Sequence, residues 1–341
     1  MAHPEHTPGF ALLEEAITVL FCEIDDAYAR LNPRGGRYAS LKRLSDSEII
    51  TLALFQQLRG VESEPSFLRE VARFFSHLFP GIVGFGPSSL HRRMRKLRRF
   101  LEPLRREVLP ELTGDPDTLV VDSTLLSVLH PRQARQSAGF EGAGWVRWGS
   151  FSVYGVKLHM LCATNRVPIS YELTPANVAE VNLIEELLAE ANLSSGGDLA
   201  RKVFGDLAYQ SGRLEEDLAE CGILLVTERA ERRGGVRQQI EIAFASLKQV
   251  FGLGETLATT LVGLATRIAA KITAYTTLTL LWSIGAWVVL RAESRSCGLE
   301  PNNTHLVLVG GLFNNPIGAV GAAVLLVGLG AIGLRVLKPV Q

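Results

Sequence analysis

The chain has 341 residues, of which 47 % are hydrophobic and 21 % are charged, so it can bury one large core and a smaller domain. Its 35 basic and 35 acidic residues give a formal net charge of zero, which offers no overall indication of a nucleic-acid partner. The four cysteines have no paired C-x-x-C spacing, which excludes a zinc ribbon, and no secretory cleavage pattern opens the chain, so we expect a reducing cytoplasm.

The first part of the chain has the periodicity of short helices. The segment Ser45–Glu48 has the spacing of a capping box, in which the serine and glutamate side chains satisfy backbone N–H groups at a helix start. Ser63 or Ser66 is expected to cap the next helix, and Ser88 the one after it. We assign residues 1–115 as a helical DNA-binding or dimerisation region.

A basic stretch lies within this region, at residues 90–100. It concentrates six cations in eleven residues, which is typical of phosphate contacts. An apolar stripe through the same stretch allows an alternative, in which the cations form the solvated face of a packed helix. Under the first interpretation the DNA-binding candidates are Arg92, Arg93, Arg95 and Lys96.

After a turn at residues 114–117, predicted strands and helices alternate. We expect strands near 118–122, 151–162, 166–174, 202–205 and 223–227, and helices near 178–193, 210–220, 236–251 and 263–291. Three strands followed by αβαβα is the ribonuclease H-like order, so the predicted fold is α/β, with a mixed sheet and flanking helices, over residues 116–292. The stretch between Pro131 and Gly149, which contains Trp145 and Trp148, is expected to be a mobile loop.

Three acidic residues occupy positions suited to holding metal ions. Asp122 closes the apolar run 118–122, Asp206 follows the run 203–205, and Glu241 lies in a predicted helix. Aspartates at strand ends reach the rim of a sheet, where ligands collect in open α/β folds. Carboxylates are the ligands that Mg²⁺ prefers, and two such ions can hold the attacking and leaving oxygens of an in-line displacement. The acids therefore suggest a site for phosphoryl transfer.

The helix that carries Glu241 offers a second indication. Arg237, Glu241 and Lys248 fall on one face of it, whereas its apolar residues mark a different face that can pack on the sheet. Arg233 belongs to a basic cluster that leads into the helix and would place cations beside the acids. The alternative is an ordinary ion pair between Arg237 and Glu241, with an incidental lysine.

These motifs resemble a known family. The pattern Arg237-x3-Glu241-x6-Lys248 is similar to the signature around the third acid of bacterial insertion-sequence transposases of the DDE superfamily. Asp122-Ser-Thr resembles the first-acid motif of those enzymes, and Gly205-Asp206-Leu-Ala-Tyr209 the second. The 34 residues between Asp206 and Glu241 are typical of the group. Residues 154–159 and 167–177 resemble its second and third strands, so the resemblance covers roughly residues 40 to 290.

The resemblance implies a ribonuclease H-like catalytic domain that cleaves DNA and transfers the cut strand. Asp122 and Asp206 would bridge two Mg²⁺ or Mn²⁺ ions, and Glu241 would hold one of them. Arg237 and Lys248 would bind phosphates near the scissile bond. The implied partners are the transposon ends and target DNA, with a homodimer during synapsis. Residues of a second tier are Ser123, Thr124, Lys157 and His159, the last of which is alternatively a structural strand histidine.

Two positions depart from the family pattern. Gly234 stands where related enzymes often carry a tyrosine, and Glu180 stands where an aspartate is common. Neither change removes a predicted metal ligand. Two other functions stay open: a ribonuclease H-like nuclease without strand transfer, and an inactive DNA-binding relic with a membrane-compatible tail.

The C-terminal part of the chain is apolar. Residues 272–290 lack charge, and the resemblance predicts that they close the catalytic core as a buried helix. Residues 293–341 are assigned as a Gly-rich tail. Within it, residues 317–334 are uncharged and long enough for a transmembrane helix, although a glycine-rich tail is the alternative. A membrane contact is expected only through these residues.

Overall fold

The computed structural model describes residues 8–34, 41–114, 116–136, 139–191, 201–227, 235–255 and 257–283. Within these ranges six strands form one mixed sheet. The strands are β1 (Thr118–Leu129), β2 (Gly144–Trp148), β3 (Phe151–Ala163), β4 (Pro168–Pro175), β5 (Arg201–Gly205) and β6 (Ile223–Thr227).

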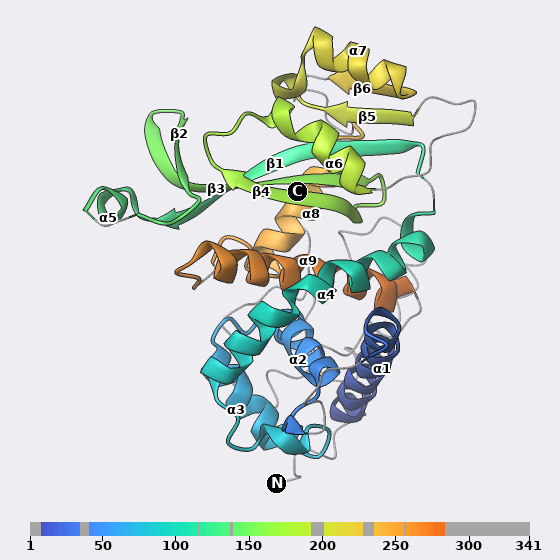
Figure 1. Ribbon diagram of the computed structural model, residues 1–341, viewed down its shortest axis with the longest axis vertical. Helices are drawn as coiled ribbons and strands as arrows, with labels where there is room; N and C mark the ends of the chain where they lie inside the picture. The colour runs from blue at the N-terminus through green and yellow to red at the C-terminus, as the bar shows by residue number, and fades with distance from the viewer. Residues whose placement is uncertain are drawn as a thin grey trace, which may run out of the picture.

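The strand order β4-β3-β1-β5-β6 confirms the predicted ribonuclease H-like sheet. β1 pairs with β3 antiparallel and with β5 parallel, and β6 pairs with β5 parallel. β3 is long enough to pair with β4 along residues 156–162 and with β2 along residues 151–155. The β2–β3 ribbon therefore extends beyond the body of the sheet (Figure 1).

Helices cover both faces of the sheet. Leu119 and Val121 of β1 belong to a cluster with α6 (Ile184–Ala191) and α7 (Gly212–Glu220). Val120, which points the other way as alternation in a strand requires, belongs to a larger cluster with α8 (Gln238–Gln249) and α9 (Leu261–Ser283). Figure 1 shows α6 and α7 on one side of the strands and α8 and α9 on the other.

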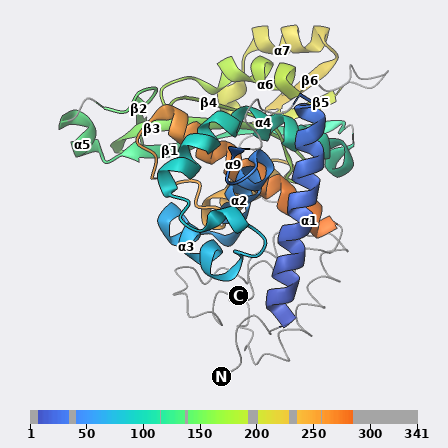
Figure 2. The same ribbon diagram turned by 60° about the horizontal axis from the view of Figure 1, so that its bottom comes forward.

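The N-terminal region is helical, as predicted. It contains α1 (Pro8–Leu31), α2 (Asp46–Arg59), α3 (Glu64–Phe74), the 3₁₀ turn η3 (Pro80–Ile82) and α4 (Pro87–Thr113). The capping box at Ser45 and Glu48 is present at the start of α2, and Ser63 caps α3. The view in Figure 2 shows these helices gathered around α9, and their apolar residues share one cluster with α8, α9 and one face of the sheet.

Three sequence predictions differ from the structure. β1 continues seven residues beyond Asp122 because its antiparallel partner β3 is long, so Asp122 lies inside a strand and not at its end. The predicted loop at 131–149 contains α5 (Pro131–Gln136) and β2, which pairing with β3 stabilises. α4 begins at Pro87 with Gly86 as its N-cap, so Ser88 lies within the first turn.

The described residues end at 283, within the apolar C-terminal part of the chain. α9 occupies residues 261–283, and its buried residues pack as the closing helix that the resemblance predicts. Among the helices of the described ranges, none has the length and apolar composition to cross a membrane. Residues 284–341, including the candidate span 317–334, lie outside the described residues, as does Arg233.

Candidate active site

Asp122 is held where the parallel pairing of β1 with β5 ends. The paired positions run from Thr118 to Val120, and Asp122 follows two residues later. Its Oδ1 accepts a hydrogen bond from the Ser123 backbone N–H at 2.8 Å. Burial is the main cause that raises the pKa of the Asp122 carboxyl to about 6, and the negative charges of Asp206 and Glu241 contribute to the rise. The hydrogen bond from Ser123 and the charge of Arg237 lower the pKa but do not cancel the rise. Both other acids thus act on this carboxyl.

Asp206 directly follows the last residue of β5. It caps the 3₁₀ turn η5 (Leu207–Tyr209), because its Oδ1 accepts a hydrogen bond from the Ala208 backbone N–H at 2.9 Å. This contact fixes one oxygen of a half-buried carboxylate at the edge of the sheet. The position at the strand end is the one predicted from the sequence.

Glu241 lies in the first turn of α8, which packs through Ile240, Phe244 and Leu247 onto β1 and the larger core cluster. Its side chain is exposed, as expected for the polar face of the helix. The predicted separation of α8 into an apolar and a polar face is therefore confirmed.

Two cations accompany the acids. Arg237, the N-cap of α8, is nearly buried, and its Nη2 lies 3.9 Å from Asp122 Oδ2. Lys248 lies in the last turn of the same helix. Partial burial lowers the pKa of its ammonium, while the charge of Asp122 opposes that change. The structure therefore brings both predicted cations into electrostatic range of Asp122.

The donor set fits a divalent metal ion in kind. Carboxylate oxygens suit Mg²⁺ or Mn²⁺. The raised pKa of Asp122 shows that the positive charge of Arg237 does not offset the effects of burial and of the neighbouring acids on this carboxyl. Within the described ranges, however, no three His, Cys, Asp or Glu side chains already stand at the spacing of a metal centre. The charges of Asp206 and Glu241 act on Asp122, but the described residues do not place the three acids as ligands of one ion.

Ser123 and Lys157 meet at Glu180, in the 3₁₀ turn η4 (Glu180–Leu183). Lys157 Nζ lies 2.7 Å from Glu180 Oε1 and donates a second bond to the Val178 carbonyl at 2.8 Å. Ser123 Oγ donates to the same Glu180 oxygen at 3.3 Å. Burial is the largest single influence and disfavours the charged carboxylate, but the hydrogen bonds to Glu180 and the charge of Lys157 together outweigh it and lower the pKa of Glu180. This polar cluster ties η4 to β1 and β3 beside Asp122.

His159 and Thr124 occupy structural positions. His159 is fully buried, and its Nε2 lies 2.9 Å from Thr174 Oγ1. Burial lowers the pKa of the imidazole to about 4, so the ring is neutral near pH 7. Thr124 is buried in β1, two residues beyond Asp122. The structural alternative given for His159 agrees with these contacts.

The basic stretch of α4 divides into two groups. Arg92, Arg95 and Lys96 are exposed on the helix surface. Arg93 instead reaches back to the start of α2, where it donates to Asp46 Oδ1 and to the Leu44 carbonyl, both at 2.6 Å. Arg93 thus has a structural contact that its exposed neighbours lack, and its role as a DNA contact stays a prediction.

Tyr209 is the residue at this site that sequence reasoning did not select. It closes η5, one turn beyond Asp206, and its ring is fully buried. Burial, followed by the charges of Asp122, Asp206 and Glu180, raises the pKa of its phenol well above the ordinary value. Its place in the motif Gly205-Asp206-Leu-Ala-Tyr209 is the sequence feature that could have identified it as part of the site.

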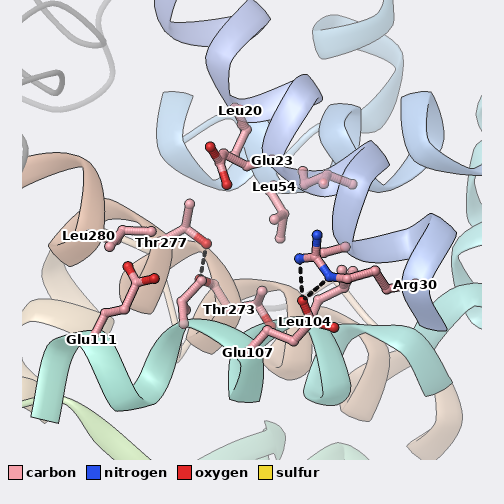
Figure 3. Close-up of a pocket in the computed structure, with 13 residues that line it drawn as sticks. Leu20, Glu23, Arg30, Leu54, Leu104, Glu107, Glu111, Thr273, Thr277 and Leu280 are labelled. Atoms are coloured by element: carbon pink, nitrogen blue, oxygen red, sulfur yellow. Dashed lines mark hydrogen bonds and ion pairs between the residues drawn. The ribbon is translucent and has the colours of Figure 1, made fainter. Parts of the chain in front are cut away.

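A separate pocket of about 280 Å³ lies among α1, α2, α4 and α9 (Figure 3). Apolar residues line it together with the ion pair between Arg30 and Glu107, whose closest atoms are 2.5 Å apart. None of the three candidate acids lines this pocket, so it is distinct from the site around Asp122.

Comparisons with known proteins concern the domain that carries the three acids. Residues 113–277, a range that contains all three acids, match the family model described as the transposase DDE domain. Among solved structures, a cryo-EM structure of the piggyBac transposase synaptic complex with hairpin DNA is 13 % identical, with a TM-score of 0.38, and the match covers 90 % of this chain and 84 % of that one. At that TM-score the likeness carries no argument here. No curated protein matches the sequence. The chain is thus similar to the transposase DDE domain over residues 113–277, somewhat less than half of its length.

Proposed function

We propose that the protein is a DNA transposase that cleaves DNA strands and transfers them, with Asp122, Asp206 and Glu241 as its metal-holding acids. One observation carries the proposal: the charges of Asp206 and Glu241 both act on the buried Asp122 carboxyl, within a transposase DDE domain. A carboxyl whose pKa is raised by neighbouring negative charges loses that repulsion when a divalent cation lies among them.

The three acids would hold Mg²⁺ or Mn²⁺, and two ions suit an in-line displacement. When bound, such an ion polarises phosphate oxygens and makes a bound water or hydroxyl a better nucleophile. The chain itself orients the carboxylates: the Ser123 N–H holds Asp122, and the Ala208 N–H holds Asp206. Arg237 and Lys248 supply positive charge for the phosphates on either side of the cut.

We further propose that the exposed face of α4 binds the DNA backbone. Its cations Arg92, Arg95 and Lys96 are on the surface, unlike Arg93, which Asp46 holds. Exposed cations along one helix suit phosphate contacts, which supply affinity without reading sequence. Two DNA ends brought together would require two copies of the chain, so a homodimer accompanies the proposal.

The test combines strand cleavage with DNA binding. Asp122→Asn, Asp206→Asn and Glu241→Gln should each abolish Mg²⁺-dependent nicking of transposon-end DNA and leave DNA binding largely intact. Asp217→Asn, at an exposed acid on α7, is the matched control and should keep full activity. Near-normal nicking by any of the three variants would remove that residue from the site. A strand-transfer assay on cleaved ends separates a transposase from a nuclease that only cuts.

A further inference from the structure

The ring of Tyr209 lies against the ends of two neighbouring strands. A Cβ atom built on Gly205, the last residue of β5, would be 3.0 Å from Tyr209 Cδ2 and 3.2 Å from Val121 Cγ1 of β1. A methyl group at position 205 would therefore press on the ring, which would have to move by a few tenths of an ångström. Glycine there lets the ring pack beside Val121, the residue before Asp122, and in the cluster under α6 and α7.

The hydroxyl of Tyr209 differs from the other buried tyrosine hydroxyls in the described part of the chain. It is inaccessible to solvent and has no hydrogen-bond partner there. By contrast, the Tyr154 hydroxyl accepts from the Phe140 N–H at 3.0 Å and donates to the Phe140 carbonyl at 3.1 Å. The Tyr275 hydroxyl donates to the Arg166 carbonyl at 3.2 Å. A buried polar group left without a partner costs about 1–3 kcal/mol, so its retention calls for a reason.

The surroundings of this hydroxyl are acidic. The groups whose charges act on it are Asp122, Asp206, Glu180 and Arg237, with Asp122 first among them. Burial and three carboxylates raise the pKa of the phenol well above its ordinary value, so the group is a hydrogen-bond donor near neutral pH. Asp206 already accepts the Ala208 N–H, and Glu180 accepts Lys157 and Ser123. Asp122 likewise accepts a backbone bond through Oδ1, and its Oδ2 lies 3.9 Å from Arg237 Nη2. We assign Asp122 as the acceptor because the Tyr209 ring packs beside Val121, the preceding residue, and because Asp122 is first among the charges that act on the hydroxyl.

We propose that Tyr209 is a positioning residue of the acid site, whose hydroxyl donates a hydrogen bond to the Asp122 carboxylate when that carboxylate holds a divalent cation. The inference rests on the proposed function and adds a residue to it. Partners that orient metal ligands from behind change metal affinity by about 10- to 100-fold when removed. The buried hydroxyl, which has no partner among the described residues, would then be the donor to the carboxylate that holds the cation.

The test compares two Tyr→Phe variants of the full chain. Tyr209→Phe should bind Mn²⁺ at least 10-fold more weakly than the parent protein in calorimetric titration, while its melting temperature without metal is equal to or above that of the parent. Tyr154→Phe, which deletes a satisfied hydroxyl, should show the reverse: a lower melting temperature without metal and unchanged Mn²⁺ affinity.

Asp206→Asn separates the two proposals. If Asp206→Asn loses Mn²⁺ binding and Tyr209→Phe binds as the parent protein does, the role of Tyr209 is refuted and the proposed function stands. If Asp206→Asn also binds normally, the metal site itself is refuted. A Tyr209→Phe protein that melts at a temperature as low as Tyr154→Phe would show that the hydroxyl serves the fold, and would equally overturn the inference.

Discussion

Arg105 is predicted to be one of the costliest single side chains to remove from this protein. Its guanidinium is fully buried where α4 meets the edge strand β4. It donates to the carbonyls of Pro168 and Ile169, the latter at 2.6 Å, and its Nη2 lies 2.5 Å from Glu102 Oε1. Arg105→Met keeps most of the apolar stem but leaves two backbone carbonyls without this donor and removes one of the two arginines that contact Glu102.

The expected loss follows from these contacts. Breaking a buried charge pair by removing one partner costs about 3–5 kcal/mol, and unsatisfied buried carbonyls belong to the same range of penalties. We therefore expect Arg105→Met to lower the free energy of unfolding by about 3–5 kcal/mol, measured by urea denaturation monitored by circular dichroism. Its duplex DNA affinity should be unchanged under conditions where the variant is folded.

Arg106 provides the matched control. It is the next residue, it contacts the same Glu102 at 3.0 Å, and its side chain is 37 % exposed. Partly exposed ion pairs contribute about 0–1 kcal/mol, so Arg106→Met should cost less than 1 kcal/mol. Equal effects of the two substitutions, or a loss below 1 kcal/mol for Arg105→Met, would show that burial of the guanidinium does not set its contribution.

Three further predictions concern pH, DNA and packing. Burial lowers the pKa of His159 from 6.5 to about 4. The stability that depends on neutral His159 is therefore fully present above pH 6.5, and about 3 kcal/mol of it is lost as the pH falls to 4. In urea titrations His159→Gln should flatten this pH dependence of stability, and an unchanged dependence would refute the assignment to His159. Alanine substitution of the exposed α4 cations Arg92, Arg95 and Lys96 should weaken duplex DNA binding. In anisotropy titrations each substitution should reduce the slope of log affinity against log salt concentration by about one, and unchanged slopes would exclude this face as the DNA contact. Gly205→Ala should destabilise the chain by about 1–3 kcal/mol through collision with the Tyr209 ring, and a Tm equal to that of the parent protein would contradict the close packing.

Much of the fold could be predicted from local pattern. The β5 and β6 runs are short, apolar and bounded by turn residues, and the structure places both within one residue of the expected bounds. The capping box at Ser45 is a purely local signal and is present. The two faces of α8 were visible in its spacing because packing on a sheet requires an apolar stripe.

The failures involve partners that are distant in sequence. β1 runs past Asp122 because β3, some 30 residues later, supplies hydrogen bonds along its whole length. Arg93 looked like its exposed neighbours, but Asp46, 47 residues earlier, holds it. Glu180 entered the sequence reasoning only as a departure from the family pattern, whereas its contacts with Lys157 and Ser123 support the strand that carries Asp122. Local periodicity contains none of this information.

The N-terminal helices and the sheet that carries Asp122 share one apolar core. Because α9 packs against both α2 and α4, and α8 and β1 contribute to the same apolar cluster, the outer face of α4 and the three acids keep a fixed offset from each other. The fold thus fixes the distance between the α4 face and the three acids independently of any DNA. Under the proposed function, a duplex bound along α4 would be cut only at a phosphate that lies at this fixed distance from its contacts with α4.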